Sequence, residues 1–282
     1  MSDSSPIVVI GATGGQGGAV LDALLDAGFA VRAVVRDAVS SKAAALADRG
    51  VELTVGDLVS GVGLTDAFTG VAGAFALTTP FESGVGAEVA QGTALIEAAT
   101  ASALPYLVFS SVASADRDTG VPHFDSKFEV ERMLAATDIP HTIVGPAYFY
   151  DNLLAGSDAL AAGVMPIAMP ADKPLQQLSR RDLGRFVATL FRDPGAYTGE
   201  RIDLASDQPT PVEMAQIAGD VLGTRVSAES YDPDRIPSPD MSAMFRFLGD
   251  RGYEVDIPAL HRRFPGVGWQ TFAEWAAEAL RG

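Results

Sequence analysis

A glycine-rich turn near the start of the chain constrains the fold more than any other feature of the sequence. Glycines stand at positions 11, 14 and 17, directly after the uncharged run 7–10, and apolar residues recur at helical spacing from Val20 to Leu25. This order of strand, glycine turn and helix is typical of a dinucleotide site, because a pyrophosphate can approach bare backbone and the unpaired N–H groups that begin the helix. A turn without a ligand is the alternative. The residues expected to hold the pyrophosphate are Gly11, Thr13, Gly14, Gln16 and Gly17.

Short apolar runs alternate with helical patterns through the first half of the chain. The runs expected to be strands are 7–10, 30–35, 51–55, 71–77, 106–110 and 141–144. This alternation predicts right-handed βαβ units in an α/β fold with a doubly wound parallel sheet. On such a sheet, ligands lie beyond the carboxyl ends of the strands.

The pattern loosens after residue 150, where prolines interrupt the apolar runs. We interpret 1–150 as a cofactor-binding domain and 151–282 as a smaller α+β cap over the strand ends. The segment around 180–206 is expected to return to the first domain, because 201–205 resembles one more strand. Thr271 and Glu274 predict a capping box for a last helix over 272–280, and both tryptophans, Trp269 and Trp275, are expected in the core of the cap.

The charge balance and the residue types exclude several classes of partner. The chain of 282 residues has 20 Lys and Arg against 36 Asp and Glu, and its net charge of −16 repels nucleic acid and anionic membranes. There is no cysteine, which excludes disulfides and thiolate metal sites, and no metal-ligand spacing occurs. No apolar run is long enough to span a membrane, and the first residues do not resemble a signal peptide. We therefore expect a cytoplasmic protein without a metal.

Arg36 ends the second expected strand. In this fold an acidic residue at that point binds the ribose 2′-hydroxyl of NAD, whereas an arginine accommodates the 2′-phosphate of NADP. The guanidinium therefore favours NADPH, while the adjacent Asp37 leaves NAD(H) as a less favoured option. A solvated arginine without a ligand is the alternative.

Polar residues also follow the third and fourth expected strands. Asp57 could accept from the adenine amino group while Leu58 covers the ring, although aspartate is equally common as a turn cap. Thr78, Thr79 and Pro80 are expected along the cofactor backbone, but they would also suit a plain strand exit.

Lys127 follows His123 by four residues in a helical pattern, which places both side chains on one face. Lys127 could hold the nicotinamide ribose, and His123 could donate a proton because histidine titrates near neutral pH. Ser110, with Ser111, could complete a polar cluster at the end of the fifth strand. The alternatives are a surface lysine and a histidine without a catalytic role.

Aromatic residues leave the sixth strand after Pro146. Tyr148 and Phe149 could stack on a nicotinamide or line a substrate pocket. They could equally pack between the two halves of the chain. We include Pro146, Tyr148 and Phe149 among the expected cofactor contacts.

Taken together, several motifs resemble the NmrA-like family of atypical short-chain dehydrogenase/reductases, over nearly the whole chain. The segments that carry the resemblance are GATGGQG at 11–17, VVRD at 34–37, SxKA at 40–43, GDL at 56–58, HFDSK at 123–127, the Pro-x-x-Phe-x-x-Asn-Leu run at 146–153, SRRDLG at 179–184 and FPG at 264–266. The resemblance implies a Rossmann domain, a smaller C-terminal domain and NAD(P)H binding, usually with a preference for NADPH. Some members are reductases of quinones or related small molecules, and others are redox sensors without turnover.

The wider superfamily uses serine, tyrosine and lysine, the last two in a Tyr-x-x-x-Lys arrangement. Lys127 matches the lysine, Ser110 lies near the serine position, and His123 stands where the tyrosine would be. The resemblance therefore supports the cofactor site more strongly than the usual proton relay.

Our leading hypothesis is an NADPH-dependent oxidoreductase that reduces a small carbonyl or quinone-like molecule by hydride transfer. Lys127, His123 and Tyr148 are the expected catalytic residues, and an ordered water could also supply the proton. The competing hypothesis is a non-catalytic NADP(H) sensor that acts through a protein partner. The oligomeric state is left open.

Overall fold

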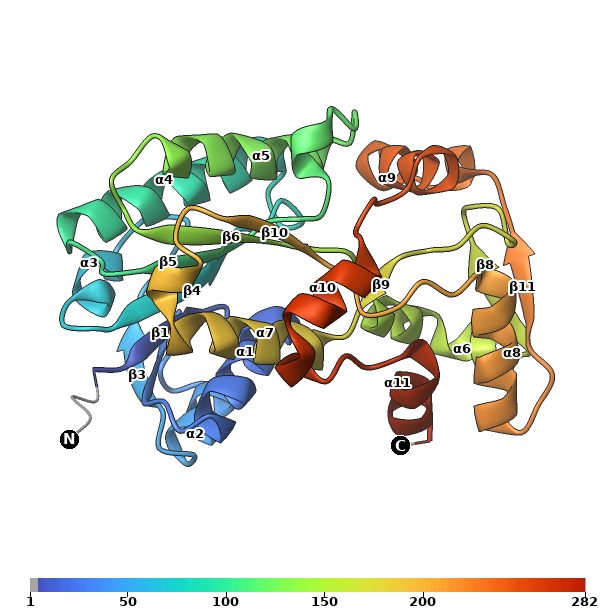
Figure 1. The fold of residues 1–282 in the computed structure, drawn as a ribbon, viewed down its shortest axis with the longest axis horizontal. Helices are drawn as coiled ribbons and strands as arrows, with labels where there is room; N and C mark the ends of the chain where they lie inside the picture. The colour runs from blue at the N-terminus through green and yellow to red at the C-terminus, as the bar shows by residue number, and fades with distance from the viewer. Residues whose placement is uncertain (1–4, 282) are drawn as a thin grey trace.

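A seven-stranded parallel sheet forms the centre of the computed structural model, which describes residues 5–281 (Figure 1). The strands of this sheet are β1 (Ile7–Ile10), β2 (Val31–Val35), β3 (Glu52–Val55), β4 (Gly73–Leu77), β5 (Leu107–Ser110), β6 (His141–Pro146) and β10 (Arg201–Leu204). They lie in the order β10-β6-β5-β4-β1-β2-β3, and every neighbouring pair is parallel. This order confirms the doubly wound α/β sheet that the alternating pattern predicts.

Helices cover both faces of the sheet (Figure 1). They are α1 (Gly15–Asp26), α2 (Ser41–Ala47), α3 (Leu64–Phe68), α4 (Val85–Ala101), α5 (Pro122–Ala135) and α7 (Arg180–Arg192). Successive residues of a strand point to opposite faces, so Val8 and Val9 of β1 belong to two different apolar clusters. The helices α1 and α7 pack closely on one face, where a Cβ on Gly184 would lie 2.2 Å from the carbonyl oxygen of Ala19.

The chain completes its sheet only in the second half. After β6 it leaves the sheet, returns through α7 and places β10 beside β6, with Arg201 opposite Ile143. The helix α7 packs on α1, so the segment from α7 to β10 lies within the sheet layers. The division of the chain at residue 150 stays a prediction.

The rest of the second half forms a cap beyond the carboxyl ends of the strands, on the right of Figure 1. Its elements are β7 (Tyr148–Phe149), α6 (Ser157–Ala161), β8 (Val164–Ile167), β9 (Gln177–Leu178), α8 (Pro211–Leu222), β11 (Ser227–Ser230), α9 (Pro239–Asp250), α10 (Ile257–Arg263) and α11 (Phe272–Ala279). The expected capping box of Thr271 and Glu274 begins α11. Trp275 lies in an apolar cluster of the cap, as expected. Trp269 lies outside this cluster: its ring stacks on His261 of α10, with centroids 4.7 Å apart, and lies 6.3 Å from Phe186 of α7.

The strand order places a crevice at the carboxyl end of β1. This strand lies between β2 and β4, and the helices that follow β1 and β4 cover opposite faces of the sheet. A crevice of this kind is where doubly wound sheets bind ligands. The glycine turn between β1 and α1 therefore lies at the expected binding position.

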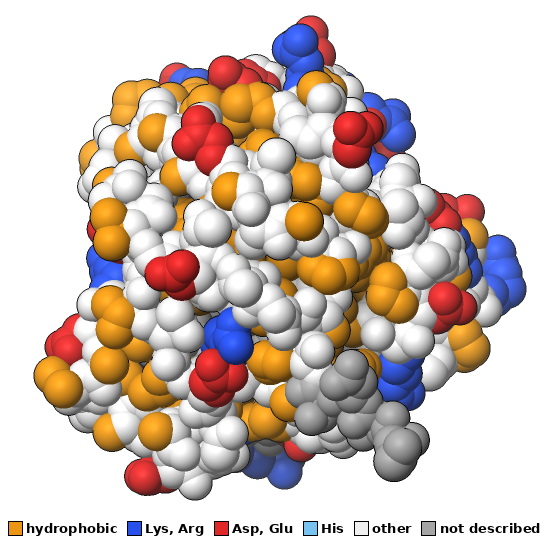
Figure 2. All heavy atoms as spheres, turned by 90° about the vertical axis from the view of Figure 1, so that its left-hand side faces the viewer, with side chains coloured by type: hydrophobic (Ala, Val, Ile, Leu, Met, Phe, Trp, Pro, Cys, Tyr) orange, Lys and Arg blue, Asp and Glu red, His pale blue; other side chains and the backbone are white. Residues whose placement is uncertain are grey.

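The face away from the cap has a mixed character. Hydrophobic, acidic and basic side chains are scattered over it, and no dense patch of one charge is visible among its coloured atoms (Figure 2). None of the helices within residues 5–281 combines the length and the apolar character needed to cross a membrane. The residues expected to carry chemistry gather instead between the sheet and the cap.

Candidate active site

The glycine turn has the geometry that an anion site requires. Gly11 adopts a φ of +74°, its carbonyl oxygen accepts from the N–H of Gly14 at 2.9 Å, and a Cβ on Gly17 would lie 2.2 Å from that oxygen. The N-cap of α1 is Gly14, which has no capping side chain. Among residues 5–281, no hydrogen bond uses the backbone N–H groups of Gly15, Gln16 or Gly17. These donors are therefore available to an anion at the helix start.

A cavity of about 360 Å³ lies along this turn. Of the residues expected to bind the cofactor, those that line it are Gly11, Thr13, Gly14, Gln16, Gly17, Arg36, Asp57, Leu58 and Thr79. The structure thus brings together, along one cavity, residues from the ends of β1, β2, β3 and β4. Pro80 and Ser110 line neither this cavity nor the larger one described below.

Arg36 lies at the mouth of this cavity with its side chain largely exposed. Its Nη1 atom is 3.6 Å from Oε2 of Glu82, which follows β4 and is also exposed. An exposed pair at this distance contributes little, because water and salt screen it. The guanidinium can therefore exchange this carboxylate for a phosphate at small cost.

Asp57 makes local contacts in the turn after β3. One carboxylate oxygen accepts from the N–H of Val59 at 2.8 Å and the other from Ser60 Oγ at 3.1 Å. This is the turn-capping geometry that the sequence left open as the alternative. Contact of Asp57 and Leu58 with an adenine stays a prediction.

A second cavity of about 640 Å³ continues from the first. Both cavities are lined by Gly15, Gln16, Leu77 and Thr79. The aromatic and methionine side chains around the second cavity come from both halves of the chain: Phe81, Phe124, Tyr148, Phe149, Met241, Met244 and Tyr253. The expected site residues that line it are Gln16, Thr78, Thr79, His123, Lys127, Pro146, Tyr148 and Phe149.

Lys127 is fixed by a fully buried carboxylate. Its Nζ atom donates to Oε1 of Glu88 at 2.7 Å and to the carbonyl oxygen of Thr78 at 2.9 Å. Glu88 also accepts from Thr78 Oγ1 at 3.0 Å and from Ser126 Oγ at 2.5 Å. An ammonium has three N–H donors, so one donor remains for the cavity that Lys127 lines.

Glu88 was not among the site residues expected from the sequence. It lies on α4, 39 residues before Lys127, in a segment composed mainly of small and apolar residues. A single acidic residue on the buried side of such a helix is rare unless it has a partner, and this was the available signal. The contact itself depends on how α4 and α5 pack.

His123 is held by the cap. Its ring is buried, and its Nδ1 atom lies 2.8 Å from Oδ1 of Asp240 on α9. The backbone N–H of His123 donates to the same oxygen at 3.0 Å. Because a carboxylate accepts from Nδ1–H, we assign the neutral ring the tautomer that leaves Nε2 as an acceptor. The pair joins the start of α5 to the start of α9, and no pattern around Asp240 predicts it.

Tyr148 and Phe149 lie on β7, where the chain passes into the cap. Burial raises the pKa of Tyr148 to about 12, and the neighbouring Asn152 side chain opposes that rise. The phenol therefore stays protonated at neutral pH. Its ring lies near Phe245 of α9, with centroids 6.1 Å apart.

The two serines after β5 are engaged with other side chains. Ser110 Oγ donates to Oε1 of Gln16 at 2.9 Å, so it lies beneath the glycine turn. Ser111 Oγ donates to the buried Glu131 of α5. Contact of Ser110 with a cofactor stays a prediction.

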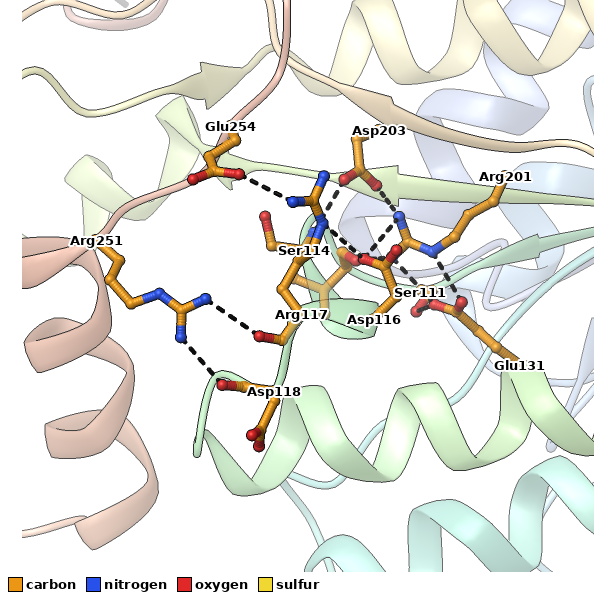
Figure 3. A network of polar contacts seen from close by, with 11 residues as sticks. Ser111, Ser114, Asp116, Arg117, Asp118, Glu131, Arg201, Asp203, Arg251 and Glu254 are labelled. Atoms are coloured by element: carbon orange, nitrogen blue, oxygen red, sulfur yellow. Dashed lines mark hydrogen bonds and ion pairs between the residues drawn. The ribbon is translucent and has the colours of Figure 1, made fainter.

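Glu131 belongs to a polar network that fixes the loop after β5 (Figure 3). Its Oε2 atom accepts from Arg201 Nε at 2.9 Å, and Arg201 also pairs with Asp203 on β10. Asp203 accepts from the backbone N–H of Ser114 at 3.0 Å. Burial raises the pKa of Asp203, and the adjacent Arg201 opposes that rise.

The same network reaches the cap (Figure 3). Arg117 donates to Glu254 at 3.0 Å, and Arg251 at the end of α9 donates to the carbonyl oxygens of Arg117 and Asp118 at 3.1 Å. The loop that carries Ser111 is thus tied to α5, to β10 and to the cap at once. Ser111 and Val112 of this loop line the second cavity.

Comparison with known proteins agrees with this geometry. The model of the NmrA-like family matches residues 3–276. Quinone oxidoreductase 2 of Escherichia coli (strain K12) is 26% identical over 245 residues, which cover 86% of this chain and 82% of that protein. The structure of the NADPH-dependent quinone oxidoreductase of Escherichia coli complexed with NADPH superposes with a TM-score of 0.82 at 25% identity, covering 97% of this chain and 99% of that one.

A second solved structure has a different role. NmrA, described as a negative transcriptional regulator and solved in complex with NAD, superposes with a TM-score of 0.80 at 21% identity, and the match covers 99% of this chain and 96% of that one. At this identity the likeness concerns the fold. The family match extends over nearly the whole chain and agrees with the resemblance seen in the sequence motifs. The chain therefore belongs to the NmrA-like family.

Proposed function

We propose that this protein is an NADPH-dependent oxidoreductase that reduces a small carbonyl or quinone-like molecule. The observation that carries the proposal is the second cavity, which continues from the glycine turn and is lined by Lys127 and by aromatic side chains. The names of the relatives, which include a quinone oxidoreductase, support the same reaction class.

The residues along the first cavity fit a phosphorylated dinucleotide. The free N–H groups of Gly15, Gln16 and Gly17 suit the diphosphate, and the exposed Arg36 guanidinium suits a 2′-phosphate. The third donor of Lys127 suits a ribose hydroxyl. When bound, the cofactor supplies a hydride to the substrate.

The second cavity suits a flat, largely apolar substrate. Aromatic rings and two methionines line it, and such side chains bind flat molecules by stacking and by adaptable packing. A substrate in this cavity would displace water, which strengthens polar interactions with the reacting carbonyl. His123 or Tyr148 would donate the proton. His123 could do so only when both of its ring nitrogens are protonated, because the neutral tautomer has no proton on Nε2.

The test is turnover by the purified protein. We expect NADPH consumption, followed at the nicotinamide absorbance band, to depend on an added quinone or aromatic aldehyde. Tyr148→Phe and His123→Gln distinguish the two candidate proton donors. The variant that lacks the true donor should have a much lower kcat, while both variants should still bind NADPH. No consumption with any acceptor would contradict the proposal.

A second candidate is a non-catalytic NADP(H) sensor. The observation in its favour is that His123 stands where the wider superfamily has a tyrosine and is held by Asp240. A protein partner whose binding depends on the ratio of NADP⁺ to NADPH, in the absence of turnover, would support the sensor.

A further inference from the structure

Arg180 lies at the junction of the two cavities, although it comes from the second half of the chain. It begins α7 and lines the second cavity together with Gly15 and Gln16, which also line the first. A Cβ on Gly15 would lie 2.6 Å from Cζ of Arg180, so the guanidinium lies against the first turn of α1. This is the turn whose first N–H groups are free.

The Arg180 guanidinium has almost no partners of its own. Among residues 5–281 it makes no hydrogen bond, and its buried Nε atom is without an acceptor. Its nearest anion is Asp151, with 3.5 Å between Nη1 and Oδ1, and the other oxygen of Asp151 is also buried without a donor. The ring of Phe149 lies 5.8 Å from Cζ and helps to orient the group.

A buried donor without a hydrogen bond destabilises a folded protein, and a bound ligand can supply the missing acceptor. The glycine turn at 11–17 contains no lysine or arginine, and Arg36 lies at the end that suits the 2′-phosphate. A diphosphate at the turn would meet amide donors but no cationic side chain from the turn itself.

We propose that Arg180 is the cationic ligand of the cofactor diphosphate, released from Asp151 when the dinucleotide binds. The inference rests on the proposed cofactor. Since no hydrogen bond holds the guanidinium, it can move from the Asp151 carboxylate to a diphosphate oxygen and gain charge-assisted hydrogen bonds. A glycine is then required at position 15 because a Cβ would enter the space that Arg180 occupies.

The test compares dissociation constants, measured by calorimetry, for NADPH, NADH and 2′-AMP, which lacks the diphosphate. A charge-assisted hydrogen bond at a site one-third exposed to solvent corresponds to about a tenfold effect. We expect Arg180→Gln to weaken NADPH and NADH by the same factor and to leave 2′-AMP unchanged. Arg36→Gln should instead weaken NADPH and 2′-AMP but not NADH.

Two further variants separate this role from a structural one. Arg192→Gln, at the exposed far end of α7, is the matched control and should bind all three ligands like the wild type. Asp151→Asn removes the competing carboxylate and should not weaken either dinucleotide. If Arg180 and Asp151 were only a structural pair, the two variants would weaken binding alike and lower the melting temperature alike.

Several results would overturn the inference. One such result is that Arg180→Gln binds both dinucleotides as tightly as the wild type. Another is an effect confined to the KM of the substrate, which would place the guanidinium in the substrate site. If Arg180→Gln does not fold, Arg180→Lys decides, because it keeps the cation and should bind NADPH more tightly than Arg180→Met. Failure of the wild type to bind either dinucleotide would refute the proposed function instead.

Discussion

The pair of Lys127 and Glu88 allows a quantitative test of how the site is built. In Lys127→Met the ammonium is lost, and the fully buried Glu88 carboxylate keeps only two hydroxyl donors, Thr78 and Ser126. Removing one partner of a buried ion pair costs about 3–5 kcal/mol, because the remaining charge is uncompensated. We expect a loss of this size in the free energy of unfolding, against a total of about 5–15 kcal/mol for a typical protein.

Removal of the carboxylate of the pair should lower the free energy of unfolding by less than removal of the ammonium. In Glu88→Gln, Lys127 keeps the Thr78 carbonyl and its access to the cavity, so we expect a loss of about 1–3 kcal/mol. In the double variant neither charge of this pair remains, and its loss should be smaller than the sum of the two single losses by about 2 kcal/mol.

The assay is equilibrium unfolding in urea, followed by circular dichroism without cofactor, for the wild type, both single variants and the double variant. Lys42→Met is the control: it makes the same change at an exposed lysine and should shift the free energy of unfolding by no more than about 0.5 kcal/mol. If Lys127→Met unfolds within 1 kcal/mol of the wild type, or if the two losses simply add, the carboxylate does not depend on the ammonium as we infer.

Three other predictions concern the cofactor turn and the cap. Arg36→Gln should weaken NADPH by about tenfold and NADH little, because only NADPH offers a 2′-phosphate; equal losses by fluorescence titration would remove Arg36 from that role. Gly17→Ala should abolish dinucleotide binding and lower the melting temperature, since its Cβ would lie 2.2 Å from the oxygen of Gly11; a crystal structure with an unshifted turn would contradict this. The pKa of Tyr148 is raised to about 12 in the folded protein, whereas an unfolded tyrosine loses its proton near pH 10. The buried phenol therefore contributes fully to stability below pH 10, and this contribution is lost as the pH rises to about 12. Tyr148→Phe should make the alkaline loss of stability less steep, and an unchanged pH profile of unfolding would show that the phenol is not buried.

The local features of the fold could be predicted because their causes are local. The run 7–10 and the turn at 11–17 fix a strand and a tight turn within neighbouring residues, and the capping box at Thr271 needs only Glu274. The elements of the cap were harder to predict, because its strands are short and their hydrophobic patterns are weak. β8, for example, contains the exposed Pro166 and pairs only with β11.

The partners of the site residues could not be predicted, because each lies far along the chain. Glu88 reaches Lys127 across two helices, and Asp240 reaches His123 from 117 residues away. Arg180 stands in a motif that carried the family resemblance, but its place beside Gly15 follows from the packing of α7 on α1. A sequence pattern can predict that a side chain belongs to the site, but the residue that it contacts depends on how distant helices pack.

The position of β10 has a consequence for how this chain could be divided or altered. The strand occupies the edge of the sheet beside β6, so a fragment ending at residue 150 would expose the hydrogen-bonding groups of β6 and the apolar surface under α7. We therefore expect such a fragment to aggregate. The stretch between β7 and β9 begins and ends at neighbouring strands, since Tyr148 pairs with Gln177, but its strand β8 pairs with β11, which lies further along the chain. A graft of that stretch from a relative would therefore have to carry α8 and β11 with it, because Met165 of β8 packs against Met214 of α8 and β8 pairs with β11.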